Sequence, residues 1–447
     1  MTQRLLSFDT IAAIATANGE GGIAIVRISG ENAYKCLKEA FRPAGKGDFS
    51  GRRMVFGHVL AKDGSVIDEC MAVFMKAPKT YTREDVAEIH CHGGRIASGL
   101  VLRRMLECGS RLAEAGEFTK RAFLNGRIDL ARAEGIMRLI SAGSESSARS
   151  AIRQMEGGAS GFVKREIERL TGAISVIEAA TDFPDEIEEQ DILPDVEKIV
   201  EQSLQNLLKA SDARSARMVR EGVSVALVGR TNAGKSSLLN ALLGQERAIV
   251  TDIPGTTRDV LTASLDIEGI RLEISDTAGQ RETDDMVEAI GVSRAKKAQE
   301  EADVVVLVLD GSEELSFEDE TLLSRADERT IVVSNKQDIA PSVPKENVLS
   351  ISAKTGEGIE KLLSEIVKKS GAIAAQDQHL TSVRHIETAK RAAECLKSAL
   401  EAICAGLPAD IVSGDIMASL SHLTGITGEN ASEKVIDRVF RDFCVGK

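Results

Sequence analysis

An eight-residue stretch between an apolar run and a helical pattern constrains this chain more than any other part of its sequence. Gly229-Arg-Thr-Asn-Ala-Gly234-Lys235-Ser236 follows the apolar run Val223 to Val228 and precedes Leu238 to Leu243. In such a loop the glycines let backbone N–H groups close around phosphates at a helix N-terminus. Lys235 adds a charge for the β- and γ-phosphates, and Ser236 supplies a hydroxyl to Mg²⁺. The sequence therefore predicts a phosphate-binding loop.

Three further motifs follow in the order expected of a guanine-nucleotide site. They are Asp276-Thr-Ala-Gly279, Asn335-Lys336-Gln337-Asp338 and Ser352-Ala353-Lys354, each directly after an apolar, strand-like run. The Asp338 carboxylate can accept two charge-assisted hydrogen bonds from guanine N1–H and its exocyclic amine, whereas adenine has an acceptor at N1 and no amine there. Because an unpaired buried carboxylate costs free energy, the motif predicts GTP rather than ATP.

The segment between the first two motifs predicts a nucleotide-dependent switch. Asp276 is expected to reach Mg²⁺ through water, and the Gly279 N–H to sense the γ-phosphate. In Gly255-Thr256-Thr257-Arg258-Asp259, Thr257 is the candidate that joins Mg²⁺ only while the γ-phosphate is present. Hydrolysis would then release the loop that follows Gly279.

The order of strand and helix patterns predicts the fold class. Four buried-strand candidates alternate with helix-length segments: Val223 to Val228, Arg271 to Ser275, Val304 to Leu309 and Thr330 to Ser334. This pattern indicates a doubly wound, mostly parallel α/β domain whose working loops follow the strand ends. Helical periodicity precedes it from Leu130 to Leu208 and resumes from Ile386 to Ile403. The final ~75 residues are few for a separate domain, so we expect the α/β domain to be inserted in a helical one.

The N-terminal part has a different pattern, rich in short strands. Ile23 to Ile28 is one candidate strand, and Val55 to Leu60 and Cys70 to Met75 flank Lys62-Asp63-Gly64. Asp-Gly is a strong hairpin signal, so this pair predicts two antiparallel strands in a β-rich α+β unit. Glu88, His90 and His92 would share one strand face, a spacing that permits a metal site. A metal is the less favoured interpretation because no thiol pair accompanies them.

Composition limits the compartment and the partners. The chain has 447 residues and a formal net charge of −13, so a nucleic-acid partner needs a local basic surface. Arg95 to Arg138, with nine basic and five acidic residues, could supply one, although a solvated mixed-charge helical face is the simpler interpretation. Seven scattered cysteines without a Cys-x-x-Cys pair indicate reduced thiols, and no apolar run reaches the roughly eighteen residues of a membrane span. We expect a cytoplasmic protein that does not enter the membrane.

Blocks outside the α/β domain carry a family resemblance. The chain resembles, from end to end, the MnmE (TrmE) family of tRNA-modification GTPases. The blocks specific to that family are Tyr81 to Gly94, Gly116-Glu117-Phe118-Thr119-Lys120-Arg121-Ala122-Phe123-Leu124-Asn125-Gly126-Arg127, Asp182-Phe183-Pro184 and the terminal Phe443-Cys444-Val445-Gly446-Lys447. The resemblance implies an N-terminal folate-binding and dimerisation domain over 1–119, a helical domain split between 120–218 and 375–447, and a GTPase (G) domain over 219–374.

The resemblance also implies the biochemical role. The family forms homodimers that work with the FAD-dependent partner MnmG, as a heterotetramer or larger complex, on tRNA. Together they add an aminomethyl or carboxymethylaminomethyl group to C5 of the wobble uridine (U34), with a one-carbon unit from a tetrahydrofolate derivative (5,10-methylene or 5-formyl form). Arg27, Glu88, Arg127 and Lys447 fall where the family holds folate; cationic side chains suit its glutamate carboxylates, and a carboxylate suits the amino-pterin edge. Cys444 would lie near folate and uridine, where a catalytic role and simple packing are equally open.

For hydrolysis, the resemblance implies K⁺ in place of an arginine finger. Its ligands would be Asn232 with backbone oxygens of Thr251, Ile253 and Thr256, and the ion would supply charge to the transition state. Glu288 matches the glutamate that orients water, although Gln280 departs from the family's apolar residue and is a weaker rival. The full set of expected GTP-binding residues is Asn232, Ala233, Gly234, Lys235, Ser236, Ser237, Thr251, Thr256, Thr257, Asp276, Thr277, Ala278, Gly279, Asn335, Lys336, Asp338, Ser352, Ala353 and Lys354.

A different class of function remains open on the residues alone. A GTP-switched binding or assembly factor would need the same G-domain motifs and no one-carbon chemistry. The N-terminal blocks discriminate between the two, because only the tRNA-modification hypothesis requires a reduced-folate site there.

Overall fold

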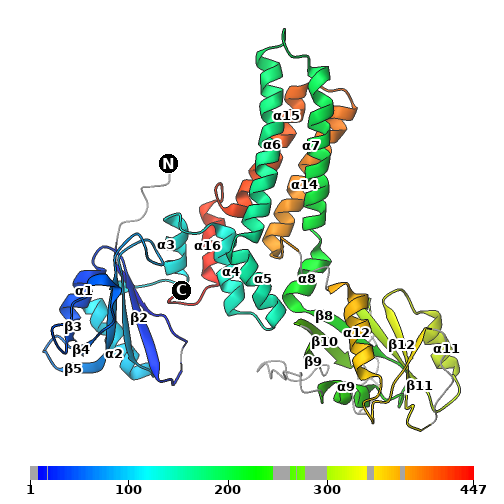
Figure 1. Ribbon diagram of the computed structural model, residues 1–447, viewed down its shortest axis with the longest axis horizontal. Helices are drawn as coiled ribbons and strands as arrows, with labels where there is room; N and C mark the ends of the chain where they lie inside the picture. Colours follow the sequence, from blue (N-terminus) through cyan, green and yellow to red (C-terminus); the bar gives the residue numbers. More distant parts are fainter. Residues whose placement is uncertain are drawn as a thin grey trace, which may run out of the picture. The chain divides into compact units, whose positions relative to one another are not determined.

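The computed structural model describes residues 9–17, 19–244, 262–267, 269–276, 300–339, 347–372 and 378–447 (Figure 1). The chain separates into two compact units, one formed by Met1–Met137 with Thr424–Lys447 and the other by Arg138–Leu423. We call them unit 1 and unit 2 and describe each by itself. Among the described helices, none combines the length and the apolar character needed to cross a bilayer.

Unit 1 is built on a seven-stranded sheet in the order β3-β4-β5-β6-β2-β1-β7. Its strands are β1 (Ile11–Ile14), β2 (Ile23–Ser29), β3 (Phe41–Pro43), β4 (Val55–Leu60), β5 (Val66–Met75), β6 (Val86–His92) and β7 (Arg111–Leu112). The hairpin predicted around Asp63-Gly64 is confirmed, since β4 and β5 pair antiparallel and Gly64 has φ +87°. β5 begins at Val66, earlier than predicted, because the polar pair Asp68-Glu69 separates its first two apolar residues from the apolar run that starts at Cys70.

Two helices cover one face of this sheet, and the opposite face carries polar side chains beside a smaller buried cluster of Ile11, Ala13, Ala113 and Phe118. The helical elements of unit 1 are α1 (Ala33–Ala40), the 3₁₀ turn η1 (Ser50–Arg52), α2 (Arg95–Glu107), α3 (Glu117–Leu124) and α16 (Glu433–Arg441), together with most of α4 (Leu130–Ile140). Ile28 and Ile89 from the sheet pack with Leu37 of α1 and Met105 of α2 in one buried cluster. Because side chains alternate along a strand, the residues between these apolar positions point to the opposite face.

The C-terminal segment completes unit 1. Phe440 and Phe443 pack against Leu130 of α4, and Val445 forms an isolated bridge with Ala115. The last residues of the chain therefore lie beside the first residues of α3, although most of the sequence separates them.

The helical part of unit 2 confirms the predicted periodicity. Its elements are α5 (Glu145–Met155), α6 (Gly158–Asp182), α7 (Glu189–Ala210), α8 (Ala213–Glu221), α14 (Val383–Cys404) and α15 (Ala409–Thr427), the last of which runs into unit 1. The Phe183-Pro184 pair separates α6 from α7, as expected of proline. α14 packs along α7, so the chain leaves the helices after α8 and returns to them at α14 (Figure 1). The predicted insertion of the α/β domain is confirmed.

The inserted domain is a six-stranded sheet in the order β13-β12-β11-β8-β10-β9. Its elements are β8 (Val223–Val228), α9 (Lys235–Leu243), β9 (Thr262–Ile267), β10 (Ile270–Asp276), β11 (Val304–Asp310), α11 (Phe317–Ser324), β12 (Thr330–Asn335), β13 (Val348–Ser350) and α12 (Ile359–Ser370). All pairs are parallel except β9 with β10. The four predicted strands are confirmed. β9 was not predicted because it is an edge strand with polar residues at alternate positions.

Candidate functional site

The sequence motifs of unit 2 meet at one edge of the sheet. Strands β10, β8, β11 and β12 are adjacent and parallel, so their carboxyl ends lie side by side. The loop Gly229 to Ser236 follows β8, and Asp276, Asp310 and Asn335 are the last residues of β10, β11 and β12. Loops at such an edge form the usual ligand site of an open α/β sheet.

The phosphate-loop backbone adopts a conformation that requires its glycines. A Cβ on Gly234, which has φ +94°, would lie 2.2 Å from Asn335 Nδ2, and one on Gly229 would lie 2.2 Å from the carbonyl oxygen of Val308. Asn232 has φ +68°, a left-handed conformation that asparagine tolerates better than most residues. The loop is therefore packed tightly between β11 and β12.

The lysine of the motif lies inside this loop. Lys235 is 6% exposed, and its ammonium donates hydrogen bonds to the carbonyl oxygens of Gly229 (2.6 Å) and Arg230 (2.7 Å). Gly234 caps α9, so Ser236 and Ser237 stand in the first turn of that helix. A positive side chain and the positive end of a helix dipole thus coincide at the loop, which suits a phosphate.

One amide side chain joins three of the motifs. Asn335 Nδ2 donates to the carbonyl oxygen of Ala233 (3.1 Å), and Asn335 Oδ1 accepts from the backbone N–H of Ala353 (3.0 Å). Asn335 is 2% exposed, so these bonds are shielded from water. The structure therefore brings the phosphate loop, the Asn-Lys-x-Asp motif and the Ser-Ala-Lys motif together, as their order in the sequence predicted.

The carboxylate of Asp338 is held by two neighbouring side chains. The Ser352 hydroxyl donates to Asp338 Oδ1 (2.7 Å), and Lys354 Nζ lies 3.8 Å from Asp338 Oδ2. The Ser352 hydrogen bond lowers the pKa of Asp338, so the carboxylate is ionised at neutral pH. An ionised carboxylate is the form that can accept from both guanine donors.

Two further residues at this edge were missed by sequence reasoning. The carboxylate of Asp310 accepts a hydrogen bond from the Lys336 ammonium (2.6 Å) and lies 3.8 Å from Arg230 Nη2. Arg230 is also ion-paired with Glu313. The available signal was that Asp310 ends a wholly apolar strand at the same sheet edge as the recognised motifs.

Part of the predicted site falls outside the described residues. These positions are Thr251, Ile253, Thr256, Thr257, Thr277, Ala278, Gly279, Gln280 and Glu288. Asp276 ends β10, but only its backbone is described. The predictions for these side chains therefore stay predictions.

A second cluster of predicted residues lies on the polar face of the unit 1 sheet. Arg27 on β2 is directly opposite Glu88 on β6, and Arg27 Nε donates to Glu88 Oε1 (2.8 Å). The Arg27 guanidinium carbon is 5.5 Å from the Tyr81 ring centre and 5.7 Å from that of Phe118. Arg127 stacks on Tyr81 at 4.5 Å and donates to its carbonyl oxygen (3.0 Å). Two of the four residues expected to hold folate, Arg27 and Arg127, thus lie against the Tyr81 ring, and a third, Glu88, pairs with Arg27.

The fourth residue reaches the same neighbourhood through its backbone. The carbonyl oxygen of Lys447 accepts a hydrogen bond from the Phe118 N–H (3.2 Å), and that of Cys444 accepts from the Gly116 N–H (3.3 Å). Phe118 connects this tail to Arg27. The Cys444 side chain is exposed.

The histidines beside this cluster have separate acidic partners. His90 Nε2 lies 3.4 Å from Glu88 Oε2, whereas His92 Nδ1 lies 2.7 Å from Asp68 Oδ1. The Asp68 hydrogen bond raises the pKa of His92. Within the described ranges, no three His, Cys, Asp or Glu side chains are grouped as a metal site.

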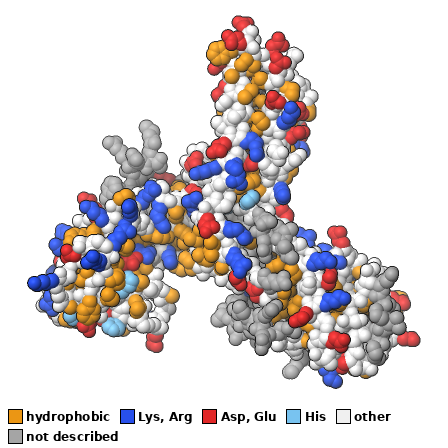
Figure 2. Space-filling model, in the orientation of Figure 1, with side chains coloured by type: hydrophobic (Ala, Val, Ile, Leu, Met, Phe, Trp, Pro, Cys, Tyr) orange, Lys and Arg blue, Asp and Glu red, His pale blue; other side chains and the backbone are white. Residues whose placement is uncertain are grey.

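The basic stretch of Arg95 to Arg138 is only in part the solvated mixed-charge face that the sequence suggested, because Arg104 and Arg121 are buried. Five of its nine basic residues have carboxylate partners: Arg104, Arg111, Lys120, Arg121 and Arg132. Arg121 is 3% exposed and pairs with Asp9, Glu84 and Glu117. The acidic partners come from within the stretch and from distant parts of the chain, so linear charge counting overestimated the free positive charge. On the face drawn in Figure 2, Lys and Arg side chains are interspersed with Asp and Glu.

Four of the seven cysteines are buried, one is partly buried and two are exposed. Burial raises the pKa of Cys70 and of Cys108 to about 12 and that of Cys91 to about 11. These thiols are protonated at neutral pH and therefore poor nucleophiles. Cys404 and Cys444 are exposed.

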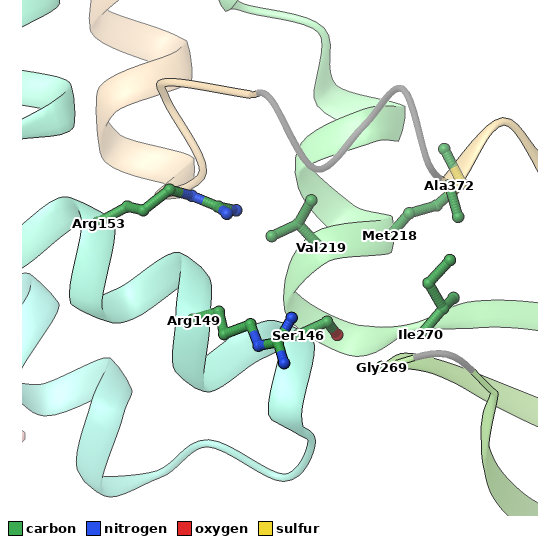
Figure 3. Close-up of a pocket in the computed structure, with 8 residues that line it drawn as sticks. All are labelled: Ser146, Arg149, Arg153, Met218, Val219, Gly269, Ile270 and Ala372. Atoms are coloured by element: carbon green, nitrogen blue, oxygen red, sulfur yellow. The ribbon is translucent and has the colours of Figure 1, made fainter.

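A cavity in unit 2 lies away from the nucleotide motifs (Figure 3). It is partly open to solvent and is lined by Ser146, Arg149, Arg153, Met218, Val219, Gly269, Ile270 and Ala372. Arg149 and Arg153 extend from α5 toward α8. Because Val219 precedes β8 and Ile270 begins β10, the cavity adjoins the amino ends of these strands. It is therefore on the opposite edge of the sheet from the phosphate loop.

Comparison with known protein families covers nearly the whole chain. Residues 10–127 match the GTP-binding protein TrmE N-terminus, and residues 130–444 match the MnmE helical domain. A tRNA modification GTPase MnmE of Natranaerobius thermophilus is 41% identical over 98% of this chain and 99% of its own length. The protein of the same name from Alkaliphilus oremlandii is 43% identical over 98% and 99%.

Two solved structures are similar to about a third of the chain. The G domain of the T. maritima FeoB iron transporter is 28% identical, with a TM-score of 0.27, over 33% of this chain and 98% of its own. Era of Aquifex aeolicus, solved with GDP.AlF4-, is 32% identical, with a TM-score of 0.28, over 33% of this chain and 57% of its own.

Proposed function

The chain belongs to the MnmE family of tRNA modification GTPases, and from that premise we propose how its two clusters divide the work. It is a GTP-hydrolysing enzyme that acts in tRNA modification. We propose that the carboxyl edge of the unit 2 sheet binds and hydrolyses GTP. The polar face of unit 1 would hold a reduced folate for wobble-uridine chemistry.

The observation that carries the GTP site is the Asn335 amide, which ties the phosphate loop to both base-recognition motifs. In this proposal, Lys235 and the first turn of α9 neutralise the β- and γ-phosphates. Asp338 accepts from the guanine N1–H and amine. Glu288 orients the attacking water, and Gln280 does not.

The donor atoms fit the two metal ions of the proposal. Ser236 and Thr257 offer hydroxyl oxygens, and hard oxygen ligands are those that Mg²⁺ prefers. Asn232 offers an amide oxygen, and the backbone oxygens of Thr251, Ile253 and Thr256 would complete a K⁺ site. The cations supply positive charge to the phosphates during hydrolysis.

The unit 1 cluster fits a ligand with an aromatic ring and carboxylates. Tyr81 and Phe118 are flanked by Arg27 and Arg127, with Glu88 beside Arg27. Aromatic faces stack on a pterin, and guanidinium groups pair with glutamate carboxylates. The folate derivative, when bound, supplies a one-carbon unit. Lys447 would contribute a further positive charge, and Cys444 is a candidate nucleophile near that unit.

The proposed reaction is the addition of an aminomethyl or carboxymethylaminomethyl group to C5 of U34. It requires the FAD-dependent partner MnmG in a heterotetramer or larger complex, and a homodimer of this chain. The support is family membership over nearly the full length.

GTP turnover of the full chain in K⁺ against Na⁺, with and without 5-formyltetrahydrofolate, tests both sites. We expect hydrolysis to be faster in K⁺ and the folate to bind independently of the cation. Equal rates in the two salts would overturn the K⁺ assignment. An absence of folate binding, together with normal U34 in cells lacking the protein, would favour a GTP-switched assembly factor.

A further inference from the structure

We propose that Asp310 is a positioning residue for guanine-nucleotide binding, because it holds the base-loop lysine and the phosphate-loop arginine in fixed places. Asp310 itself need not touch the nucleotide. The inference rests on GTP binding at the carboxyl edge of the sheet.

The carboxylate is almost fully enclosed and uses both of its oxygens. Its side chain is 4% exposed. Oδ1 accepts from the backbone N–H (3.0 Å) and the hydroxyl (2.6 Å) of Ser312, which fix its orientation. Oδ2 accepts from Lys336 Nζ (2.6 Å) and lies 3.8 Å from Arg230 Nη2. One oxygen thus connects the loop expected to bind the base with the loop expected to bind the phosphates.

The contact with Lys336 fixes a side chain that lies between Asn335 and Asp338 in sequence. Lys336 has φ +65°, so its backbone is already in an uncommon conformation. With its ammonium held at Asp310, the four-carbon stem is stretched beside the base loop instead of sampling solvent. A lysine ordered before binding does not lose that rotamer freedom when the base arrives, which favours affinity.

The backbone beside Asp310 strengthens the same connection. The Gly311 N–H donates to the carbonyl oxygen of Asn335 (2.8 Å). A Cβ at Gly311 would lie 2.5 Å from that oxygen, so no larger residue fits without movement. The pair Asp310-Gly311 therefore fixes both the main chain and the lysine of the base loop.

Burial alone would raise the pKa of Asp310, but the hydrogen bonds from Lys336 and Ser312 outweigh it, and the pKa is lowered. The carboxylate is charged at neutral pH. Replacing it with an amide keeps its size and removes the charge that holds Lys336.

The same strand offers a matched control at its other end. Asp303, just before β11, is 3% exposed, lies 2.5 Å from Arg217 Nη2, and accepts from the Ser224 N–H (3.0 Å). It therefore resembles Asp310 in burial and charge pairing but stands at the edge opposite the phosphate loop.

The experiment compares Asp310→Asn with Asp303→Asn in the full chain, measuring the Kd of GDP and the KM and kcat for GTP. We expect Asp310→Asn to raise GDP Kd and GTP KM on the order of tenfold, the effect of losing one good charge-assisted contact, with kcat within about twofold. GDP and GTP should be affected equally, since the γ-phosphate is not involved. Asp303→Asn should lower Tm and leave KM unchanged. If Asp310→Asn left KM unchanged, or both variants raised it equally, the proposal would be wrong.

A second variant, Lys336→Met, tests whether Asp310 affects nucleotide affinity by holding Lys336. It remains informative even if Asp310→Asn folds poorly. Lys336→Met keeps the stem but loses the ammonium, and its side chain is 31% exposed, so folding should tolerate it. Lys336→Met should raise the Kd of GDP about as much as Asp310→Asn does. The double variant should then have a Kd close to that of Lys336→Met alone. Fully additive losses would contradict a shared route. A wild-type chain that failed to bind GDP at all would overturn the proposed GTP site itself.

Discussion

The two candidate sites of this chain are assembled in opposite ways. At the nucleotide edge, four adjacent parallel strands deliver short contiguous motifs, and many of the contacts use backbone atoms, as with Asn335 and Ala233. On the unit 1 face, single side chains come from distant positions, Arg27, Glu88, Arg127 and the C-terminal tail. A site built from contiguous motifs can be recognised in the sequence. A site built from residues far apart in the sequence can be recognised only in the folded structure.

The sites also differ in how they hold charge. Lys235 is buried within its own loop, where carbonyl oxygens accept its hydrogen bonds. Arg27 is paired with Glu88, so a ligand that engages either group must compete with an existing salt bridge. We therefore expect substitutions to cost more at the nucleotide edge than on the unit 1 face, and the predictions below test that order.

The largest effect is expected from the residue that orients water. Glu288→Ala should lower kcat for GTP roughly 100- to 1,000-fold, the range typical of losing a positioned acid–base group, with little change in GDP affinity. Gln280→Ala is the matched control and should stay within a fewfold of wild type. Single-turnover hydrolysis measures both, and a severe loss confined to Gln280→Ala would reverse the assignment.

The next effect tests base recognition. Asp338→Asn replaces a double acceptor with one acceptor and one donor, so the KM for GTP should rise about 100-fold or more. Xanthosine triphosphate, whose C2 carries a carbonyl in place of the amine, should become the better substrate. Because the Ser352 hydrogen bond lowers the pKa of Asp338, wild-type GTP affinity should hold as pH falls to the ordinary aspartate range and be lost only below it. Unchanged selectivity in the variant would contradict the role of Asp338.

The sequence predicted the α/β domain better than unit 1 for a physical reason. Strands β8, β11 and β12 are buried along most of their length, so their sequences are mainly apolar, and turns with strict backbone demands follow them. In unit 1, β3 and β7 have only three and two residues, too few to show a period. The pairing of Arg27 with Glu88 depends on the register of β2 with β6, which no local pattern specifies.

Because local patterns do not specify contacts between distant residues, the sequence also gave a misleading picture of the basic stretch Arg95 to Arg138. Arg121 sits in a sequence that looks like a positive helix face, but its partners Asp9 and Glu84 are distant in the chain. Only the family resemblance distinguished the block around Arg121, Gly116 to Arg127, from an ordinary helix. The structure shows that Arg121 is part of a buried ion-pair network.

That network gives the third prediction, on stability. Burial tends to raise the pKa of Glu117, but hydrogen bonds from Arg111, the Glu114 N–H and Arg121 lower it from 4.5 to about 2. At 1.36 kcal/mol per pH unit, the ionised form stabilises the fold by about 3 kcal/mol. The folded pKa lies below the unfolded one, so this contribution is present above about pH 4.5 and is lost as pH falls toward 2.

Glu117→Gln should therefore lower the free energy of unfolding by about 3 kcal/mol at pH 7, and the deficit should shrink in acid. Exposed Glu114→Gln, three residues earlier, is the control and should stay within about 0.5 kcal/mol. Denaturant unfolding followed at several pH values measures both. A Glu117→Gln deficit that did not depend on pH would show that packing, not charge, causes it.

The smallest effect should come from the unit 1 face, where a ligand meets an arginine that is already paired. Arg27→Ala removes the guanidinium near Tyr81 and Phe118 and breaks its ion pair with Glu88, so we expect the Kd for 5-formyltetrahydrofolate to rise about tenfold. GTP turnover should not change, because the nucleotide motifs all belong to unit 2. Arg42→Ala, an exposed position on β3 at the far edge of the same sheet, should leave both quantities unaltered. Calorimetry with the folate and a GTPase assay on the same samples separate the two sites, and a folate Kd equal to wild type in Arg27→Ala would place the folate elsewhere.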